Sequence, residues 1–236
     1  MDASDQSPGS LYLVPSPIGN LGDVTYRSIE TLSAVDSIAC EDTRHSHRLL
    51  SRYGIDKPLF PVHEHNEHRA VHKVRVLLES GLDVAYLSNA GTPGISDPGY
   101  TLVRMACEVG LPVRVLPGPT ALIPALVQSG LPVHSFTFKG FPPRKPGPRR
   151  RSLEAEVASP HTLIFYESPH RVVRLLNDVL DVLGDRRAAL VREATKLHEE
   201  TLRGTVSDLL ASLADRTLKG ECVVLVAGVE RGATMP

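Results

Sequence analysis

The stretch LYLVPSPIGNLGDVT (Leu11–Thr25) passes from an apolar run directly into a turn with two prolines, two glycines, an asparagine and an aspartate. A strand that ends in such a turn before a helix leaves backbone N–H groups free for a polar or anionic ligand. The turn lacks G-x-G-x-x-G, and no lysine follows its glycines, so neither common phosphate-binding loop is indicated. Its role therefore depends on which other loops lie beside it.

From Leu11 onward, apolar strands alternate with amphipathic helices, which is typical of a mostly parallel sheet covered on both faces. In open α/β sheets, ligands bind beyond the carboxyl ends of the strands. Such ends are followed by PSPIGNLGD, SNAGTPGISDPG and LPGPTA. Glycine allows close approach of the backbone to a ligand, and proline fixes the loop shape. The three loops together favour a nucleoside cofactor held largely by main-chain groups.

The pattern changes at LPGPTALIPALVQSGLP, where prolines flank and interrupt a helix of small residues. We place a domain boundary near Gly118. This gives a frayed tail at 1–10, an N-terminal α/β domain at 11–118 and a C-terminal α/β domain at 119–236. Strands that follow one another without long helices predict a mixed sheet in the second domain.

Two helix starts carry a capping signal. Asp97 is expected to cap a helix whose first residue is Pro98. A second helix is expected from Ser168, with Pro169 in its first turn.

The composition is that of an ordinary globular protein: 236 residues, 42% apolar, with a formal net charge of −1. The three cysteines, Cys40, Cys107 and Cys222, lie far apart in predicted strands and helices. They suit buried apolar positions better than disulfides or zinc, which favours a reducing, cytoplasmic setting. We expect no signal peptide and no membrane span, because no run approaches about 20 apolar residues.

A set of motifs resembles the small-subunit ribosomal RNA methyltransferase I family: VPSPIGNLGDVT, CEDTRHS, HEHNE, SNAGTPGISDPGY, LPGPTA, IFYESPHR, REATK and GECVV. The resemblance extends from Leu11 to about Gly228. It implies two α/β domains of the tetrapyrrole methylase type. It also implies a homodimer that uses S-adenosylmethionine, bound in a cleft between the domains, to methylate the ribose 2′-hydroxyl of a cytidine in the decoding region of small-subunit ribosomal RNA. The substrate is expected to be this RNA or the assembled small subunit.

The resemblance also implies a set of cofactor-binding residues. Asn89 departs from the family, which usually has aspartate in this stretch. Asparagine keeps an acceptor oxygen but loses the negative charge, so we expect a weaker cofactor contact. By position the set is Pro17, Gly19, Asn89, Gly91, Thr92, Pro93, Ile95, Thr120, Ala121, Tyr166 and Ala194, with Glu193 beside them.

Methyl transfer to a ribose hydroxyl requires the nucleophile, the methyl group and the leaving sulfur to be in line. The reaction is accelerated by a base or by a cation that stabilises the developing alkoxide. The candidates lie in CEDTR, PVHEHNEH and REATK, and the sequence does not choose among them. We favour Lys196 with Glu193, because a desolvated lysine can act as a base. Arg44 is the third catalytic candidate.

The segment PPRKPGPRRR predicts the RNA contact, because we expect a loop stiffened by proline and glycine to hold its charges out toward a phosphate backbone. His68 and His72 form an i, i+4 pair, but the histidine run crosses a predicted turn, so we expect no metal site. The expected RNA contacts are Arg144, Lys145, Arg149, Arg150, Arg151, His63, Glu64, His65 and Arg171.

Three other functions remain open. A methylase of the same fold that acts on a small tetrapyrrole would have no need for the arginine-rich segment. A nucleotide-binding module without catalysis would leave the charged groups at the strand ends unexplained. A metal-dependent hydrolase would require the histidines to converge.

Overall fold

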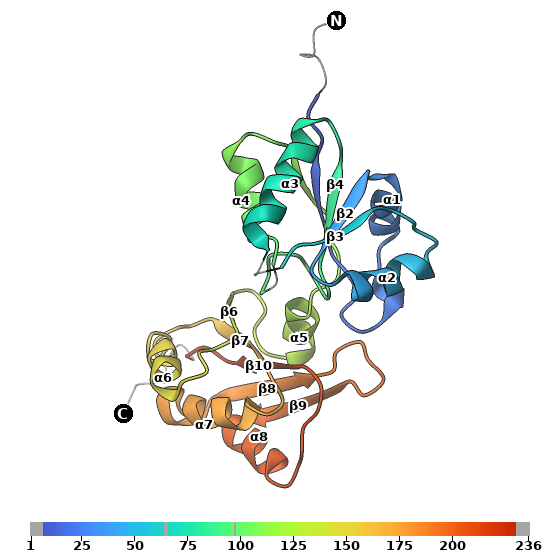
Figure 1. Cartoon of the computed structure of the whole chain (residues 1–236). Coiled ribbons are helices and arrows are strands. Elements are labelled where there is room, and N and C mark those ends of the chain that lie inside the picture. Colours follow the sequence, from blue (N-terminus) through green and yellow to red (C-terminus); the bar gives the residue numbers. More distant parts are fainter. Residues whose placement is uncertain (1–6, 64–65, 97, 230–236) are drawn as a thin grey trace, which may run out of the picture. The chain divides into compact units, whose positions relative to one another are not determined.

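The computed structural model describes residues 7–63, 66–96 and 98–229 (Figure 1). The chain divides into two compact units, residues 1–120 and 121–236. Gly9 and Ser10 belong to the first unit, because their N–H groups donate to the Leu78 carbonyl and the Asp83 carboxylate. The expectation of a frayed tail is therefore wrong for these two residues.

The first unit is built on a five-stranded sheet in which every pair is parallel. Strands β2 and β4 are buried along their whole length, because helices cover both faces of the sheet. The strand order is β3-β2-β4-β1-β5, with bounds β1 Leu11–Val14, β2 Ser37–Cys40, β3 Leu59–Pro61, β4 Val84–Leu87 and β5 Val113–Val115.

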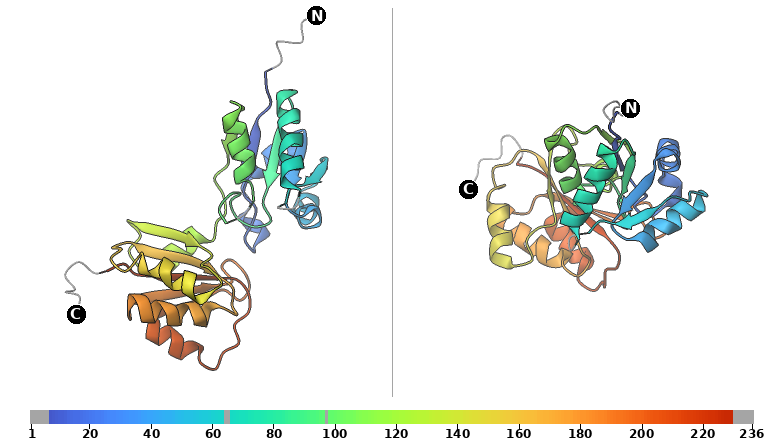
Figure 2. Two further views of the ribbon diagram at one scale, coloured as in Figure 1. Left: turned by 60° about the vertical axis from the view of Figure 1, so that its left-hand side comes forward. Right: turned by 45° about the horizontal axis from the view of Figure 1, so that its top comes forward.

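Alternate residues of these strands pack into two separate cores. Helices α3 (Glu67–Glu79) and α4 (Tyr100–Glu108) cover one face, and α1 (Tyr26–Ala34) and α2 (Thr43–Arg52) cover the other (Figure 2). The short helix η1 (Leu21–Asp23) lies in the loop after β1. The predicted parallel sheet is confirmed.

The second unit holds a mixed five-stranded sheet, as the sequence predicts. Only the β6–β7 pair is parallel; the other three pairs are antiparallel. The order is β6-β7-β10-β8-β9, with bounds β6 Phe136–Gly140, β7 Thr162–Glu167, β8 Arg187–Arg192, β9 Glu200–Thr205 and β10 Cys222–Val226.

Helices again cover both faces of this sheet. Helices α6 (Pro146–Glu154), α7 (Val172–Leu183) and α8 (Val206–Leu213) pack on one face, and α5 (Leu122–Ser129) packs on the other (Figure 1). A capping box between Thr205 and Asp208 starts α8.

Both predicted helix starts are displaced. Helix α4 begins at Tyr100 with Gly99 as its N-cap, and Pro98 precedes the helix; Asp97 lies outside the described residues. Helix α7 begins at Val172, after a turn over residues 168–171 in which the Arg171 N–H donates to the Ser168 carbonyl. Ser168 is therefore not the cap of α7.

The structure bears on two other sequence-based expectations, the burial of the cysteines and the lack of a membrane span. Cys40 and Cys222 are buried, but Cys107 is exposed on α4, so its expected burial is wrong. Within the described ranges, no helix has the combination of length and apolar character that a membrane span requires.

Candidate functional site

The three Gly/Pro-rich loops of the first unit lie at one edge of its sheet and are joined by hydrogen bonds. Ser16 and Gly91 exchange two backbone hydrogen bonds, of 3.0 and 2.9 Å. The Ser88 hydroxyl donates to the Gly91 carbonyl at 2.5 Å, and the Thr92 hydroxyl donates to the Pro119 carbonyl at 3.0 Å. The loops after β1, β4 and β5 therefore form one cluster.

The expected cofactor residues of this unit take different places in the cluster. Gly91 has a φ of 75°, and Ile18, Pro119 and Thr120 lie within van der Waals distance of its missing side chain. Gly19 and Ile95 are exposed. The more enclosed members are Pro17, Asn89, Gly91, Thr92, Pro93 and Thr120.

A pocket of about 220 Å³ opens between the first two loops and α2. Ser16 Oγ and Asn89 Oδ1 belong to residues that line it, and both atoms are buried without a hydrogen-bond partner in the described part of the chain. A buried polar atom left unpaired costs about 1–3 kcal/mol, which a bound ligand with matching polar groups would recover. The pocket is smaller than the ~300–1,000 Å³ of a typical ligand pocket, so it suits part of a larger ligand.

The pocket lining includes residues that sequence reasoning missed. Arg44 is absent from the lining, and its side chain is 95% exposed, beside Asp42 at the start of α2. His45 and Arg48 of the same helix do line the pocket. The i, i+3 spacing of these two residues and the adjacent Leu49 was the signal that could have identified this face of α2.

A charged cluster follows β8 in the second unit. Lys196 Nζ lies 2.9 Å from Glu193 Oε1 and 2.8 Å from Glu221 Oε2. Glu193 Oε1 also accepts the Glu221 N–H at 2.8 Å. Glu193 and Thr195 have positive φ angles of 52° and 68°, which are unusual for residues with a side chain. A side chain at Gly220 would overlap Glu193, so glycine is required there.

The contacts within this cluster determine the charge that Lys196 carries. Burial alone would lower the pKa of Lys196, but its contacts with Glu221 and Glu193 outweigh burial and raise it. Burial would raise the pKa of Glu193, but the hydrogen bonds from Lys196 and the Glu221 N–H lower it. Lys196 is therefore held as a cation in this structure, which favours a stabilising charge over a desolvated base. Its catalytic role stays a prediction.

Three expected cofactor residues of the second unit lie around one apolar cluster. Ala121, Tyr166 and Ala194 pack against the core under α5. Tyr166 also makes edge-on ring contacts with Phe138 and Phe141, with centroids 4.9 and 5.7 Å apart. Tyr166 at the end of β7, Ala194 after β8 and Ala121 at the start of α5 therefore lie on the same face of the sheet.

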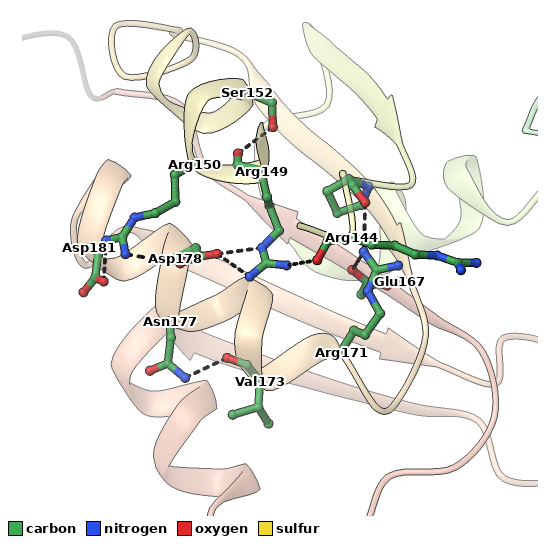
Figure 3. Close-up of polar contacts among 11 residues, drawn as sticks. Arg144, Arg149, Arg150, Ser152, Glu167, Arg171, Val173, Asn177, Asp178 and Asp181 are labelled. Carbon is green, nitrogen blue, oxygen red and sulfur yellow. Dashed lines mark hydrogen bonds and ion pairs between the residues drawn. The ribbon is translucent and has the colours of Figure 1, made fainter. Parts of the chain in front are cut away.

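The basic segment is not the outward-facing loop that the sequence suggests. Residues 146–154 form α6, and Arg149 is buried, with its Nε 2.6 Å from Asp178 Oδ2 (Figure 3). Arg150 pairs with Asp181 at 2.6 Å. The prediction that Arg149 reaches RNA is wrong, because its charge is neutralised inside the unit.

The other basic residues expected to contact RNA also include both paired and unpaired cations. Arg171 pairs with Glu167 at 3.0 Å and donates to the Pro142 carbonyl. Arg144, Lys145 and Arg151 are exposed, and the described residues form no ion pair with them.

The expected contacts in the histidine run are only partly described. His63 follows β3, and its N–H donates to Asn66 Oδ1. Glu64 and His65 lie outside the described residues. In the parts of the chain that the structure describes, no three His, Cys, Asp or Glu side chains are grouped as a metal ion would require.

Comparison with known proteins places these features in a family. The sequence profile of Tetrapyrrole (Corrin/Porphyrin) Methylases matches residues 10–210. The "Ribosomal RNA small subunit methyltransferase I" of Micromonospora olivasterospora is 50% identical over 227 residues, which cover 96% of this chain and 72% of the relative. The protein of the same name from Escherichia coli O157:H7 is 48% identical, with 96% and 80% covered.

Solved structures share the fold at low identity. The methyltransferase CobJ superposes with a TM-score of 0.71 at 20% identity, covering 94% of this chain and 95% of that one. Diphthine synthase superposes with a TM-score of 0.69 at 14% identity, covering 93% and 90%.

Proposed function

Because the chain belongs to the ribosomal RNA small subunit methyltransferase I family, within the tetrapyrrole methylases, we propose that it methylates the ribose 2′-hydroxyl of a cytidine in the decoding region of small-subunit ribosomal RNA. The family named from the motifs is confirmed. The observation that carries the proposal is the loop cluster of the first unit, where Ser16 and Asn89 line a pocket and each has a buried oxygen atom without a hydrogen-bond partner in the described residues.

The residues of this pocket fit part of S-adenosylmethionine. Asn89 Oδ1 would accept a hydrogen bond from a hydroxyl or ammonium group, and Ser16 Oγ would donate or accept one. When bound, S-adenosylmethionine supplies an electrophilic methyl group on its sulfonium sulfur. The hydrogen bonds that join the loops hold their shape, which favours alignment for an in-line transfer.

We assign Lys196 as the cation that stabilises negative charge developing on the ribose oxygen. Glu193 and Glu221 hold its ammonium group in place, and its raised pKa keeps it charged at neutral pH. Glu193 acts as an anchor for Lys196, because its lowered pKa makes it a weak base.

The proposed partner is small-subunit ribosomal RNA, in the assembled subunit or free, and the exposed Arg144, Lys145 and Arg151 are the proposed phosphate contacts. We further propose that the protein works in the cytoplasm as a homodimer. Sedimentation at several concentrations tests the dimer.

The direct test is transfer of labelled methyl from S-adenosylmethionine to small ribosomal subunits from cells that lack this enzyme. Nuclease digestion and nucleoside analysis should yield a labelled 2′-O-methylcytidine derivative. Label on a base alone, or no label although the cofactor binds, would contradict the proposal and point to another acceptor such as a small tetrapyrrole.

Asn89→Asp is expected to tighten cofactor binding several-fold. A carboxylate accepts roughly twice as strong a hydrogen bond as an amide oxygen, and Asn89 Oδ1 has no protein partner to lose in the described residues. Asn89→Ala should weaken binding by about tenfold, since it removes the acceptor. Calorimetric titration with S-adenosylmethionine measures both variants. Equal affinity of all three proteins would remove Asn89 from the site.

Changing Arg144, Lys145 and Arg151 together to alanine should reduce the salt dependence of RNA binding. Each phosphate contact contributes about 0.7–0.9 to the slope of log K against log salt, so we expect the slope to fall by about 2. Filter binding of small subunits across salt concentrations measures this slope. Alanine at the exposed Arg27, Arg52 and Arg187 is the charge-matched control and should leave it unchanged.

A further inference from the structure

Two arginine side chains hold the peptide that connects β6 to α6. Arg171 Nη2 donates to the Pro142 carbonyl at 2.8 Å. Arg149 Nη1 donates to the Arg144 carbonyl at 3.2 Å. Figure 3 shows the Arg149 guanidinium group in contact with the Arg144 carbonyl. The backbone of residues 142–144 is therefore fixed at two points.

Each of these arginines is also tied to a buried carboxylate. Arg149 contacts Asp178 of α7, and these two side chains are 6% and 10% exposed. Arg171 contacts Glu167 at the end of β7, where the carboxylate is 1% exposed. A guanidinium can bind a carboxylate and a carbonyl in different directions at once, which the compact ammonium of lysine does with much less directional control.

Two of the unpaired cations lie close to these fixed points. Arg144, whose own carbonyl is held, and Lys145 lie two and three residues after Pro142, whereas Arg151 lies in the last turn of α6. Arg150, by contrast, is neutralised by Asp181 and contacts no backbone carbonyl in the described structure. The segment thus contains cations that are paired with carboxylates and cations that are exposed and unpaired in the described residues.

We infer that Arg149 and Arg171 are positioning residues that hold Arg144 and Lys145 ready for RNA phosphates. This inference rests on the proposed function, because it takes ribosomal RNA as the ligand. Fixing the backbone of a residue lowers its conformational entropy. A segment that the protein already holds in its bound conformation therefore loses less entropy when RNA binds. Arg149 and Arg171 therefore raise RNA affinity without touching RNA.

The test is the charge-conserving double variant R149K/R171K. Lysine keeps the net charge and can pair with Asp178 or Glu167, but it cannot also hold the carbonyls in the same geometry. We expect the Kd for small ribosomal subunits, and the KM in methyl transfer, to rise about 5–10-fold. The value of kcat and the cofactor affinity should stay within twofold. Hydrogen exchange at the residue 149 amide, which donates to the Lys145 carbonyl, should accelerate.

R150K is the matched control on the same helix and should leave RNA affinity and exchange unchanged. If the double variant does not fold, the single variant R171K replaces it in these measurements, because the Arg171 side chain is 21% exposed and its replacement disturbs the interior less. Faster exchange with unchanged RNA affinity would overturn the inference. So would a parallel loss of RNA affinity, cofactor affinity and melting temperature, which indicates a structural role only. Because RNA affinity is measured directly, an absence of methyl transfer by the wild type would contradict the proposed function and not this inference.

Discussion

Replacing Lys196 with methionine is expected to lower kcat for methyl transfer by about 10²–10³-fold, the usual effect of removing one group that stabilises developing negative charge. Methionine keeps much of the length of the side chain but removes the ammonium group that Glu193 and Glu221 hold. Cofactor affinity should change little, because the buried, unpaired oxygen atoms that we assign to cofactor binding lie in the loops of the first unit. Single-turnover transfer to small subunits measures the effect on chemistry.

Lys219→Met is the matched control. Lys219 is exposed two residues before Glu221, and no ion pair of its ammonium group is described. The Lys219→Met variant should retain the wild-type kcat. A Lys196 variant with wild-type kcat would exclude this lysine from the chemistry.

The pH profile separates the two roles considered for Lys196. Its contacts with Glu193 and Glu221 raise its pKa, so the ammonium and its stabilising contacts persist below the ordinary lysine value and are lost only as the pH rises through the raised pKa. The Lys196 contribution to kcat should therefore be flat between about pH 7 and 10. A lysine with this raised pKa that acted as a base would instead give a rate that rises tenfold per pH unit over this range, because its neutral form would be scarce below the pKa.

The fold was predictable because its signals are local. Strands such as VDSIAC and LDVAYLS are apolar throughout, which is typical of parallel strands buried on both faces, and β2 and β4 are buried in this way. The helix starts were less predictable, because a serine followed by a proline can begin a turn as well as a helix. Residues 168–171 form such a turn, in which the Arg171 N–H donates to the Ser168 carbonyl, and α7 begins at Val172.

The candidate site depends on partners distant in sequence. The charge pattern of the sequence does not distinguish Arg149 from Arg151. In the fold, however, Asp178, 29 residues beyond Arg149, pairs with Arg149 in the interior of the unit and does not pair with Arg151. In the same way, Glu221 is 25 residues from Lys196, and together with Glu193 it reverses the direction of the Lys196 pKa shift. A charge pattern indicates that cations are present, whereas the tertiary fold decides which remain available to a ligand.

The buried position of Arg149 predicts the largest effect on stability. Arg149→Met should lower the free energy of unfolding by about 3 kcal/mol, because it leaves the Asp178 carboxylate buried without its main partner. The loss should fall at the lower end of the usual range of about 3–5 kcal/mol, since Arg150 Nη1 remains 3.6 Å from Asp178 Oδ1. Urea denaturation measures the change.

Two further variants decide whether burial is the cause. Arg150→Met removes a partly exposed ion pair with Asp181 and should cost less than about 1 kcal/mol. The double variant R149M/D178L replaces both charges with apolar groups and should recover most of the stability, because the uncompensated carboxylate is gone. If Arg149→Met and Arg150→Met cost the same, the Arg149–Asp178 pair is not shielded from water, and the division of the basic segment into buried and exposed cations would fail with it.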